Sequence, residues 1–345
     1  MKRALRVFVS ALLVCAFGLA AAGQYPPGPA FDSEQVEVPD QGTVMPVPNK
    51  SGQKYRIAVI GLENNPFWVP VREGSLEAKK ILAPFDCTVD WIVPPGEQHT
   101  ADFFGTTIEA AMVQQYDAIA TVAGDSGIVP YINGAVEAGI PVATFNVETT
   151  EPNERLFFVG ADLYLQGRVA GETMAKLLNG KGKVAVQTGF FSVEGLEQRR
   201  LGFEESLKEF GPDIEIVGRV ENLERNDIAY SQTKDFLTAH PDLGGVFSAA
   251  SGAAGTARAL EEAGLPPGKV KIVCYDFYDE VMEHVATGGI TCTIGQEPIS
   301  QGRDPAIRLY NYMEGGVVPP AARLFTKMPV VTKENYREYW TPPGE

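Results

Sequence analysis

The chain has 345 residues, with 29 Lys and Arg against 44 Asp and Glu, and a formal net charge of −15. Phosphate backbones and anionic lipids repel so acidic a chain, which argues against a nucleic-acid binder or a membrane-surface protein. An apolar content of 44 % excludes general disorder, the length suggests about two domains, and four Cys with three His are too few for a disulfide scaffold or a zinc module.

The first 22 residues have the pattern of a secretory signal peptide. Three basic side chains precede the apolar run Val7–Leu19, and the small residues Ala20–Ala22 follow it. The run is about 13 residues long, short of the roughly 20 that span a bilayer. We therefore expect export with cleavage. A lipid anchor at Cys15 is disfavoured, because Cys15 follows the branched Val14 and lies inside the apolar run.

Residues 23–53 are rich in proline and show neither the helical nor the strand period. This composition predicts an extended, mobile linker that spaces the folded part from the signal or from a surface.

Three cysteines lie beyond the signal: Cys87, Cys274 and Cys292. An odd number leaves at least one thiol unpaired. Cys274 and Cys292 fall in successive predicted strands and could pair. The alternative is that both are small buried apolar side chains, and it is favoured because no C-x-x-C or metal-ligand spacing is present.

From residue 55 onward, short apolar runs of strand length alternate with longer helical patterns. The predicted strands are 55–62, 87–93, 118–123, 141–146, 156–159, 183–188, 214–220, 245–249, 270–276 and 290–294. The predicted helices are 67–83, 102–115, 128–138, 163–179, 196–210, 227–239, 253–264 and 278–287. This alternation is typical of parallel sheets covered on both faces, and so many strands imply two α/β lobes. Such sheets bind ligands at the carboxyl ends of their strands.

Candidate binding residues follow the first and third predicted strands. Asn65 is a helix N-cap by type and place, and Phe67 and Trp68 then begin the helix at the mouth of the expected cleft. Aromatic faces there suit a sugar ring, although a first-turn aromatic is more often part of a core. The sequence of Gly124–Gly127 resembles a serine-protease nucleophile loop, but the strand–helix context is wrong for that fold. Asp125 is expected to cap the next helix and is also a candidate ligand contact.

Further candidates follow strands of the second half. Arg199 enters a helix and offers a fork of donors to hydroxyls or a carboxylate. Tyr275 and Asp276 end another strand, and an ionised Asp can accept two hydroxyl hydrogen bonds. Gln296 ends the last strand and offers both a donor and an acceptor. No phosphate-binding loop, dinucleotide fingerprint or zinc-protease motif is present, so we expect no cofactor and no metal.

These residues resemble the periplasmic ribose-binding-protein family. Its members are the type I solute-binding proteins of sugar ABC transporters, and they are related to LacI-type repressor cores. The resemblance covers residues 54–340. Its markers are Asn64–Trp68, Gly139–Val142, Gly160–Asp162 with Gly167 and Gly171, Arg199 with Gly202 and Phe203, Leu237–Asp242, Tyr275–Asp276 and Thr293–Gln296.

The resemblance implies two doubly wound parallel-sheet lobes joined by a three-strand hinge. The N-terminal lobe would comprise 54–159 plus 297–325, and the C-terminal lobe 160–296 plus 326–340. The crossovers would lie near Gly160, Gln296–Pro298 and Phe325. Ligand contacts would come from Asn65, Phe67 and Trp68 in the first lobe, and from Arg199, Tyr275, Asp276 and Gln296 in the second lobe and the hinge.

The sequence also departs from the ribose-binding pattern. Asn146 and Val147 stand where ribose binders carry Asp-Arg, and Ala123 stands where a polar residue is expected. An expected aromatic falls at Glu224, and Ala250–Ser251 replaces an Asn-Asp pair with one residue deleted. We therefore take Asn146, Asn226 and Ser251 as further candidates for ligand contact. Because a pocket built to bond hydroxyls rejects ligands that leave its groups unpaired, another pentose, a hexose or a polyol is expected, not ribose.

The function implied is an exported, monomeric, non-enzymatic receptor that delivers a monosaccharide or polyol to an ABC permease. Two alternatives stay open: a receptor for a chemotaxis or kinase sensor, and a binder of a non-sugar ligand such as a nucleoside. A hydrolase with two cleft carboxylates would be distinguished by turnover of its ligand. A repressor is excluded, because residues 1–53 offer a signal and a proline-rich stretch in place of a DNA-binding helix-turn-helix.

Overall fold

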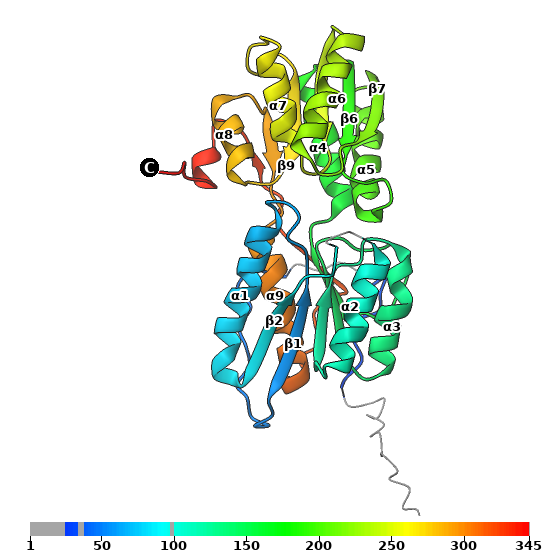
Figure 1. Ribbon diagram of the computed structural model, residues 1–345, viewed down its shortest axis with the longest axis vertical. Coiled ribbons are helices and arrows are strands. Elements are labelled where there is room, and N and C mark those ends of the chain that lie inside the picture. The colour runs from blue at the N-terminus through cyan, green and yellow to red at the C-terminus, as the bar shows by residue number, and fades with distance from the viewer. Residues whose placement is uncertain (1–24, 34–37, 97–99, 345) are drawn as a thin grey trace, which may run out of the picture.

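The short apolar strands form two six-stranded sheets, one in each of two α/β lobes (Figure 1). The computed structural model describes residues 25–33, 38–96 and 100–344. The first sheet has the order β11-β5-β4-β3-β1-β2, and all its pairs are parallel. Its strands are β1 (Tyr55–Ile60), β2 (Cys87–Ile92), β3 (Ala118–Thr121), β4 (Val142–Phe145), β5 (Phe157–Gly160) and β11 (Arg323–Phe325).

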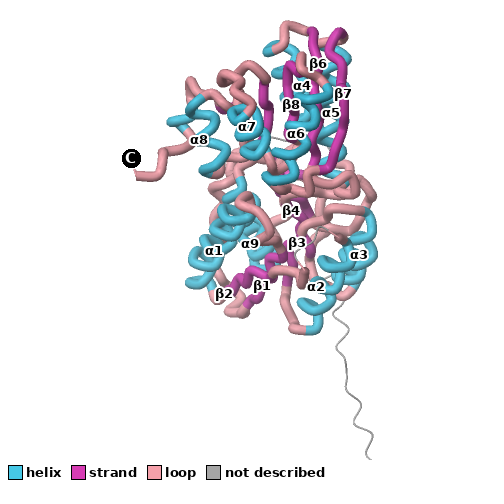
Figure 2. The backbone as a smooth tube through the Cα atoms, turned by 45° about the horizontal axis from the view of Figure 1, so that its top comes forward, coloured by secondary structure: helices cyan, strands magenta, loops and turns pink. Residues whose placement is uncertain are grey.

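Helices cover both faces of the first sheet (Figure 2). They are α1 (Trp68–Leu82), α2 (Ala101–Val113), α3 (Val129–Glu137) and α9 (Pro298–Gly315), with 3-10 turns η1 (Ala83–Phe85) and η2 (Ser126–Ile128). Helices α1 and α9 lie against each other, and glycines allow the approach: a Cβ on Gly302 would lie 1.8 Å from the carbonyl oxygen of Val71. Because the strands are buried on both faces, they read as continuous apolar runs.

The second sheet has the order β12-β10-β9-β8-β6-β7, and only the β10–β12 pair is antiparallel. Its strands are β6 (Lys181–Thr188), β7 (Asp213–Glu221), β8 (Leu243–Ser248), β9 (Lys271–Tyr275), β10 (Cys292–Ile294) and β12 (Val330–Val331). Its helices are α4 (Leu163–Leu177), α5 (Glu194–Phe210), α6 (Asn226–Ala239), α7 (Ala253–Glu262), α8 (Asp279–Thr287) and the 3-10 turn η3 (Tyr336–Glu338).

The chain passes between the sheets three times: between β5 and β6, between β10 and α9, and between β11 and β12. The two-lobe α/β fold class predicted from sequence is confirmed, and the predicted strands and helices lie within a few residues of the observed ones. The prediction did not include α9, β11 or β12. Helix α9 is buried along most of its length, so it lacks the polar face of a surface helix.

The N-terminal segment, defined as residues 25–33 and 38–54, differs from the predicted spacer. It contains no helix or strand, but it lies along α9 of the first lobe. Val44 is buried, and the Gly42 N–H donates to Asp304 Oδ2 at 2.6 Å. The Val47 N–H donates to Asn311 Oδ1 at 2.8 Å. Its proline-rich backbone therefore pairs with polar side chains of α9, which a reading by secondary-structure period does not detect.

Cys87, Cys274 and Cys292 are buried free thiols, as the favoured sequence interpretation had it. Cys274 and Cys292 lie on neighbouring strands, and the Cys274 thiol points to the Cys292 carbonyl at 3.7 Å. Over the ranges that the structure describes, no helix is both long and apolar enough to cross a membrane. The predicted signal peptide, 1–22, and Cys15 lie outside the described residues.

Candidate ligand-binding site between the lobes

A pocket with about 450 Å³ of empty space, part of it open to solvent, lies where the carboxyl ends of the strands of both sheets meet. It is called the cavity below. Eight of the eleven predicted site residues line it. These are Asn65, Phe67, Trp68, Asn146, Arg199, Ser251, Asp276 and Gln296. Since parallel strands bring their carboxyl ends to one edge, residues far apart in sequence converge there.

The first lobe presents the turn after β1. Asn65 Oδ1 accepts from the Phe67 N–H at 3.0 Å, and α1 begins only at Trp68, so Asn65 holds a turn and is not the helix N-cap. Phe67 and Trp68 meet edge to face with ring centroids 5.5 Å apart. Trp68 is 1 % exposed, so it is chiefly a core side chain that also forms part of the cavity wall.

Asn146 follows β4 and has a φ of 69°, in the left-handed region that Asn tolerates better than most residues. Its Nδ2 donates to Gln301 Oε1 at 3.1 Å, and Gln301 Nε2 donates to the Gln296 carbonyl at 2.6 Å. This chain of amides connects the first-lobe wall to the crossover before α9. It fixes the orientation of the Asn146 side chain at the cavity.

The Arg199 guanidinium is 3 % exposed and held on several sides. Its Nη1 donates to the Ala249 carbonyl, and its Nη2 donates to Gln166 Oε1, both at 2.6 Å, and to Gln296 at 3.2 Å. It lies over the Tyr275 ring, 3.8 Å from the centroid. Burial lowers the pKa of Arg199, although the neighbouring Tyr275, Asp276 and Glu224 oppose that shift. Arg199 therefore positions other groups as well as lining the cavity.

Asp276 is the carboxylate at the end of β9. It is 9 % exposed, with a left-handed φ of 76°, and its Oδ1 accepts from Gln296 Nε2 at 2.6 Å. Burial raises the pKa of Asp276 to about 6, against the lowering effects of Gln296 and Arg199, and the charge of Glu224 adds to the rise. Charge is costly at this position, so a ligand that donates hydrogen bonds to the carboxylate relieves that cost.

The sequence analysis did not select Glu224 as a site residue. It follows β7 and lines the cavity, and Asn65 Nδ2 donates to Glu224 Oε2 at 2.6 Å across the two lobes. Leu223 and Glu224 both have positive φ, at 53° and 58°, so this sharp turn directs the side chain to the cavity. Glu224 stands where ribose binders carry an aromatic residue, and this departure is the signal in the sequence that marks the position.

Three predicted residues do not line the cavity. Asp125 caps η2 by accepting from the Gly127 N–H, and it also accepts from the Ala101 N–H. Asn226 begins α6 and bonds Glu280 and the Gly255 N–H. Tyr275 lies behind Arg199 with its hydroxyl on the Gln166 carbonyl. The polar groups of these three residues therefore have hydrogen-bond partners within the protein and serve local structure.

The rest of the cavity wall is apolar: Val147, Leu163, Val193, Leu196 and Ala250. Its ionisable groups are Arg199, Glu224 and Asp276. The described part of the chain holds no group of three or more His, Cys, Asp or Glu side chains that could bind a metal. The arrangement suits reversible hydrogen bonding to a small polyhydroxylated molecule with some apolar surface.

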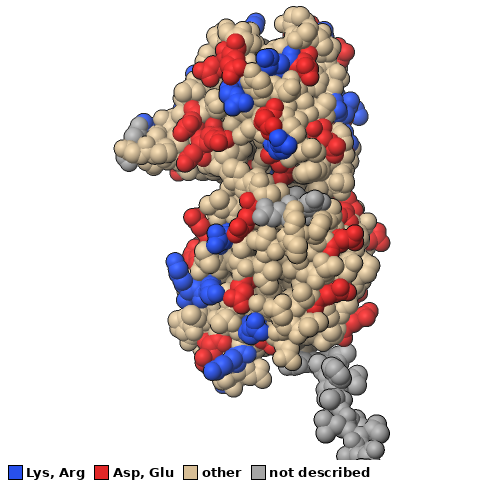
Figure 3. All heavy atoms as spheres, in the orientation of Figure 1, with Lys and Arg blue, Asp and Glu red and all other residues tan. Residues whose placement is uncertain are grey.

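Charge on the outside gives a different picture. Figure 3 shows acidic side chains on both lobes of the face in view, with basic side chains among them and a narrow waist between the lobes. On this face, acidic and basic side chains are interspersed, and no patch of a single sign dominates.

Residues 57–316 match the family described as periplasmic binding protein domain. The xylose/arabinose-binding protein of Sulfolobus acidocaldarius is 24 % identical, covering 93 % of this chain and 79 % of that protein. The D-ribose/D-allose-binding protein of Pseudomonas aeruginosa is 28 % identical over 64 % of this chain and 72 % of its own. An ABC transporter solute-binding protein of Burkholderia graminis, solved with D-arabinose, has a TM-score of 0.76 at 25 % identity, covering 83 % and 98 % of the two chains.

Proposed function

Because the chain belongs to the periplasmic binding protein domain family, we propose that it is an exported receptor that binds a monosaccharide or polyol between its lobes and delivers it to an ABC-transporter permease. The observation that carries the proposal is the cavity at the strand ends of both sheets, in which Asp276, Gln296 and Arg199 form one connected hydrogen-bond network. Relatives named for xylose, arabinose, ribose and allose support the ligand class.

The chemistry of the wall supports a hydroxyl-rich ligand. Asp276 supplies a charged acceptor, and Gln296 supplies amide groups already aligned with it. Charged acceptors form the stronger hydrogen bonds, and a buried one left without donors is penalised. Phe67 and the aliphatic residues cover the apolar faces that a sugar ring also has. Ligand contacts are therefore proposed for Asn65, Phe67, Trp68, Asn146, Arg199, Ser251, Asp276 and Gln296, with Glu224 added.

Ribose itself is not the ligand we propose. Asn146 offers an amide where a carboxylate would accept from two hydroxyls, and Glu224 offers a carboxylate where ribose binders place an aromatic ring. Exchanging donors and acceptors at two points of a buried site changes which hydroxyl pattern is fully paired. The selected sugar should thus differ from ribose in ring size or in the orientation of a hydroxyl.

Binding is proposed to couple to closure of the two lobes, 54–159 plus 297–325 and 160–296 plus 326–340, about the three crossings. A ligand draws the lobes together when it makes contacts that exist only in the closed arrangement. The protein acts as a monomer after removal of residues 1–22, and it releases its ligand unchanged.

A thermal-shift screen of the exported protein against pentoses, hexoses, polyols and nucleosides tests this proposal, followed by calorimetry on each hit. A ligand that binds only the folded state raises the melting temperature by mass action. Incubation with the hit, followed by NMR of the recovered ligand, shows whether it is returned intact.

Stabilisation by one sugar or polyol that Asp276→Ala abolishes, with ligand recovered intact, is the expected result. Stabilisation by a nucleoside alone would retain the fold and overturn the sugar assignment. Conversion of the ligand would overturn the receptor role.

A further inference from the structure

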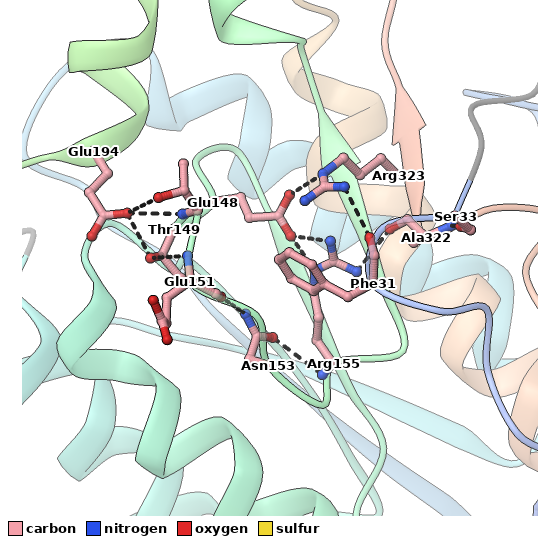
Figure 4. Close-up of polar contacts among 11 residues, drawn as sticks. Phe31, Ser33, Glu148, Thr149, Glu151, Asn153, Arg155, Glu194, Ala322 and Arg323 are labelled. Carbon is pink, nitrogen blue, oxygen red and sulfur yellow. Dashed lines mark hydrogen bonds and ion pairs between the residues drawn. The ribbon is translucent and has the colours of Figure 1, made fainter.

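A second contact between the lobes lies outside the cavity, at the first residue of α5. The Glu194 carboxylate belongs to the second lobe, and the donors that it meets among the described residues all belong to the first. Figure 4 shows its contact with Thr149. Oε2 accepts from the Thr149 hydroxyl at 2.7 Å and from the Thr150 N–H at 2.9 Å and hydroxyl at 3.2 Å. Oε1 accepts from the Ser126 N–H at 2.9 Å.

The backbone joins the same contact, because the Glu194 N–H donates to the Gly124 carbonyl at 2.9 Å. Burial alone would raise the pKa of Glu194, but the hydrogen bonds from Thr149, Thr150 and Ser126 outweigh it and lower the pKa overall. The carboxylate is therefore ionised at neutral pH while it holds these donors.

The loop that carries Thr149 and Thr150 is itself fixed in place. Glu148 binds Arg155, and Glu148 Oε2 also accepts from Arg323 Nε at 2.9 Å, which joins the loop to β11. Phe31 of the N-terminal segment lies against both guanidinium groups (Figure 4). The guanidinium carbons of Arg155 and Arg323 are 4.5 and 4.7 Å from the centroid of its ring. Donors held by a rigid loop lose little entropy when they meet the carboxylate.

The residue after Glu194, Gly195, has no side chain and so permits the backbone of α5 to lie close to the first lobe. A Cβ on Gly195 would lie 3.1 Å from Val147 Cβ of the first lobe, and 2.7 Å from Leu163 Cδ1 of its own lobe. Buried Val193 and Leu196 on either side pack into the core cluster of the first lobe. The start of α5 is thus shaped to meet the first lobe at short range.

We propose that Glu194 is an interlobe latch: a positioning residue that stabilises the closed arrangement and so raises affinity for every ligand by the same factor, without touching the ligand. Glu194 does not line the cavity. The effect on affinity rests on the proposed receptor function, whereas the effect on lobe closure does not. Apparent affinity scales with the population of the closed, binding-competent state, so a contact made only there changes all dissociation constants equally.

The test compares Glu194→Gln with the wild type and with Glu197→Gln. Glu197 lies on the same helix and pairs with Arg200 of that helix, so its variant removes a similar charge without touching the first lobe. Gly195→Ala is the second variant, because it obstructs the approach to Val147 while keeping the carboxylate. Calorimetry with D-ribose, D-allose, D-xylose, D-arabinose and D-galactose measures affinity, and small-angle X-ray scattering without sugar measures the radius of gyration.

Glu194→Gln is expected to raise the dissociation constants of the two tightest-binding sugars of the panel by the same factor, about tenfold, because a partly exposed charged acceptor is lost. Its radius of gyration without sugar should increase, Gly195→Ala should act in the same direction, and Glu197→Gln should match the wild type. Unchanged affinity and radius in Glu194→Gln would overturn the latch. A change in the ratio of the two dissociation constants would also overturn it, because Glu194 would then act on the ligand.

If the wild type binds no sugar of the panel, the receptor assignment for these sugars fails and the scattering still decides the latch. A larger radius in Glu194→Gln than in Glu197→Gln would support it, and equal radii would refute it.

Discussion

Asp276→Asn should stabilise the protein without ligand and at the same time weaken sugar binding. The carboxyl is buried at the cavity, and its pKa is raised from 3.8 to about 6. The folded state therefore holds the proton more firmly than the unfolded chain. The stability that this group contributes is full below about pH 4 and is lost as pH rises through 6. An asparagine keeps an acceptor for Gln296 and has no charge to bury.

The size of the effect follows from the shift. Two pKa units at 1.36 kcal/mol each mean that ionised Asp276 costs up to about 3 kcal/mol of folding stability at pH 7. Asp276→Asn should thus be more stable than wild type by up to about that amount at pH 7, and the two should converge near pH 4. Loss of a charged acceptor for two hydroxyls should weaken sugar binding by about 100-fold or more, since such bonds contribute ~1.5–3 kcal/mol each.

Urea denaturation of both proteins without sugar, at pH 4 and at pH 7, measures the first effect, and calorimetry at pH 7 measures the second. The reasoning is refuted if Asp276→Asn is less stable than the wild type at pH 7, or if its gain in stability over the wild type is smaller at pH 7 than at pH 4. It is also refuted if the stability difference between the two proteins does not change with pH.

Three further predictions concern the surroundings of the site. Glu224→Gln should lower the pKa of Asp276, because the Glu224 charge contributes to its rise; carboxyl ¹³C NMR titration checks this. Gly167→Ala should lower the free energy of unfolding by about 2 kcal/mol or more and weaken ligand binding, because the new Cβ would lie 2.0 Å from the Arg199 carbonyl oxygen. Urea denaturation measures the stability and calorimetry the binding, and an unchanged denaturation midpoint would contradict the close packing. Removal of residues 25–53 should lower the melting temperature by several degrees, because Asp304 loses the Gly42 N–H in a buried position; an unaltered melting curve would restore the spacer interpretation.

Much of the fold could be predicted because both sheets are parallel at their centres. Central parallel strands are buried on both faces and give short apolar runs, which local sequence shows directly. The edge strands β11 and β12 have three and two residues and give no such run. Helix α9 is long enough to give a pattern, but the sequence does not show it, because Arg303, Asp304 and Arg308 are buried on this helix and interrupt the apolar period.

The site could be predicted as far as strand ends could be located. A polar residue directly after a strand reaches the cavity when its backbone turns sharply, as Asp276 does at a φ of 76°. Whether it turns into the cavity or caps the next helix depends on local geometry, and Asp125 takes the second course. Apolar lining such as Leu163 and Val193 carries no sequence signal at all, because it looks like any core residue.

The two sheets share one topology, so each lobe places a polar side chain at the same position in the cavity. The two side chains differ in charge. Strands β5-β4-β3-β1-β2 of the first sheet match β10-β9-β8-β6-β7 of the second in order. Asn146 follows the fourth strand of one lobe and Asp276 the fourth strand of the other, with φ angles of 69° and 76°. Equivalent turns thus place an uncharged amide and a carboxylate in the same cavity. Carboxylates at both positions would repel each other and raise the cost of burying charge in the cavity, a cost to which Glu224 already contributes. With an uncharged amide at Asn146, Asp276 is the single charged acceptor of the two equivalent turns. Replacing Asn146 with Asp should therefore raise the pKa of Asp276 further and make binding more sensitive to acid, and a binding profile between pH 5 and 8 that stays unchanged in Asn146→Asp would contradict this account.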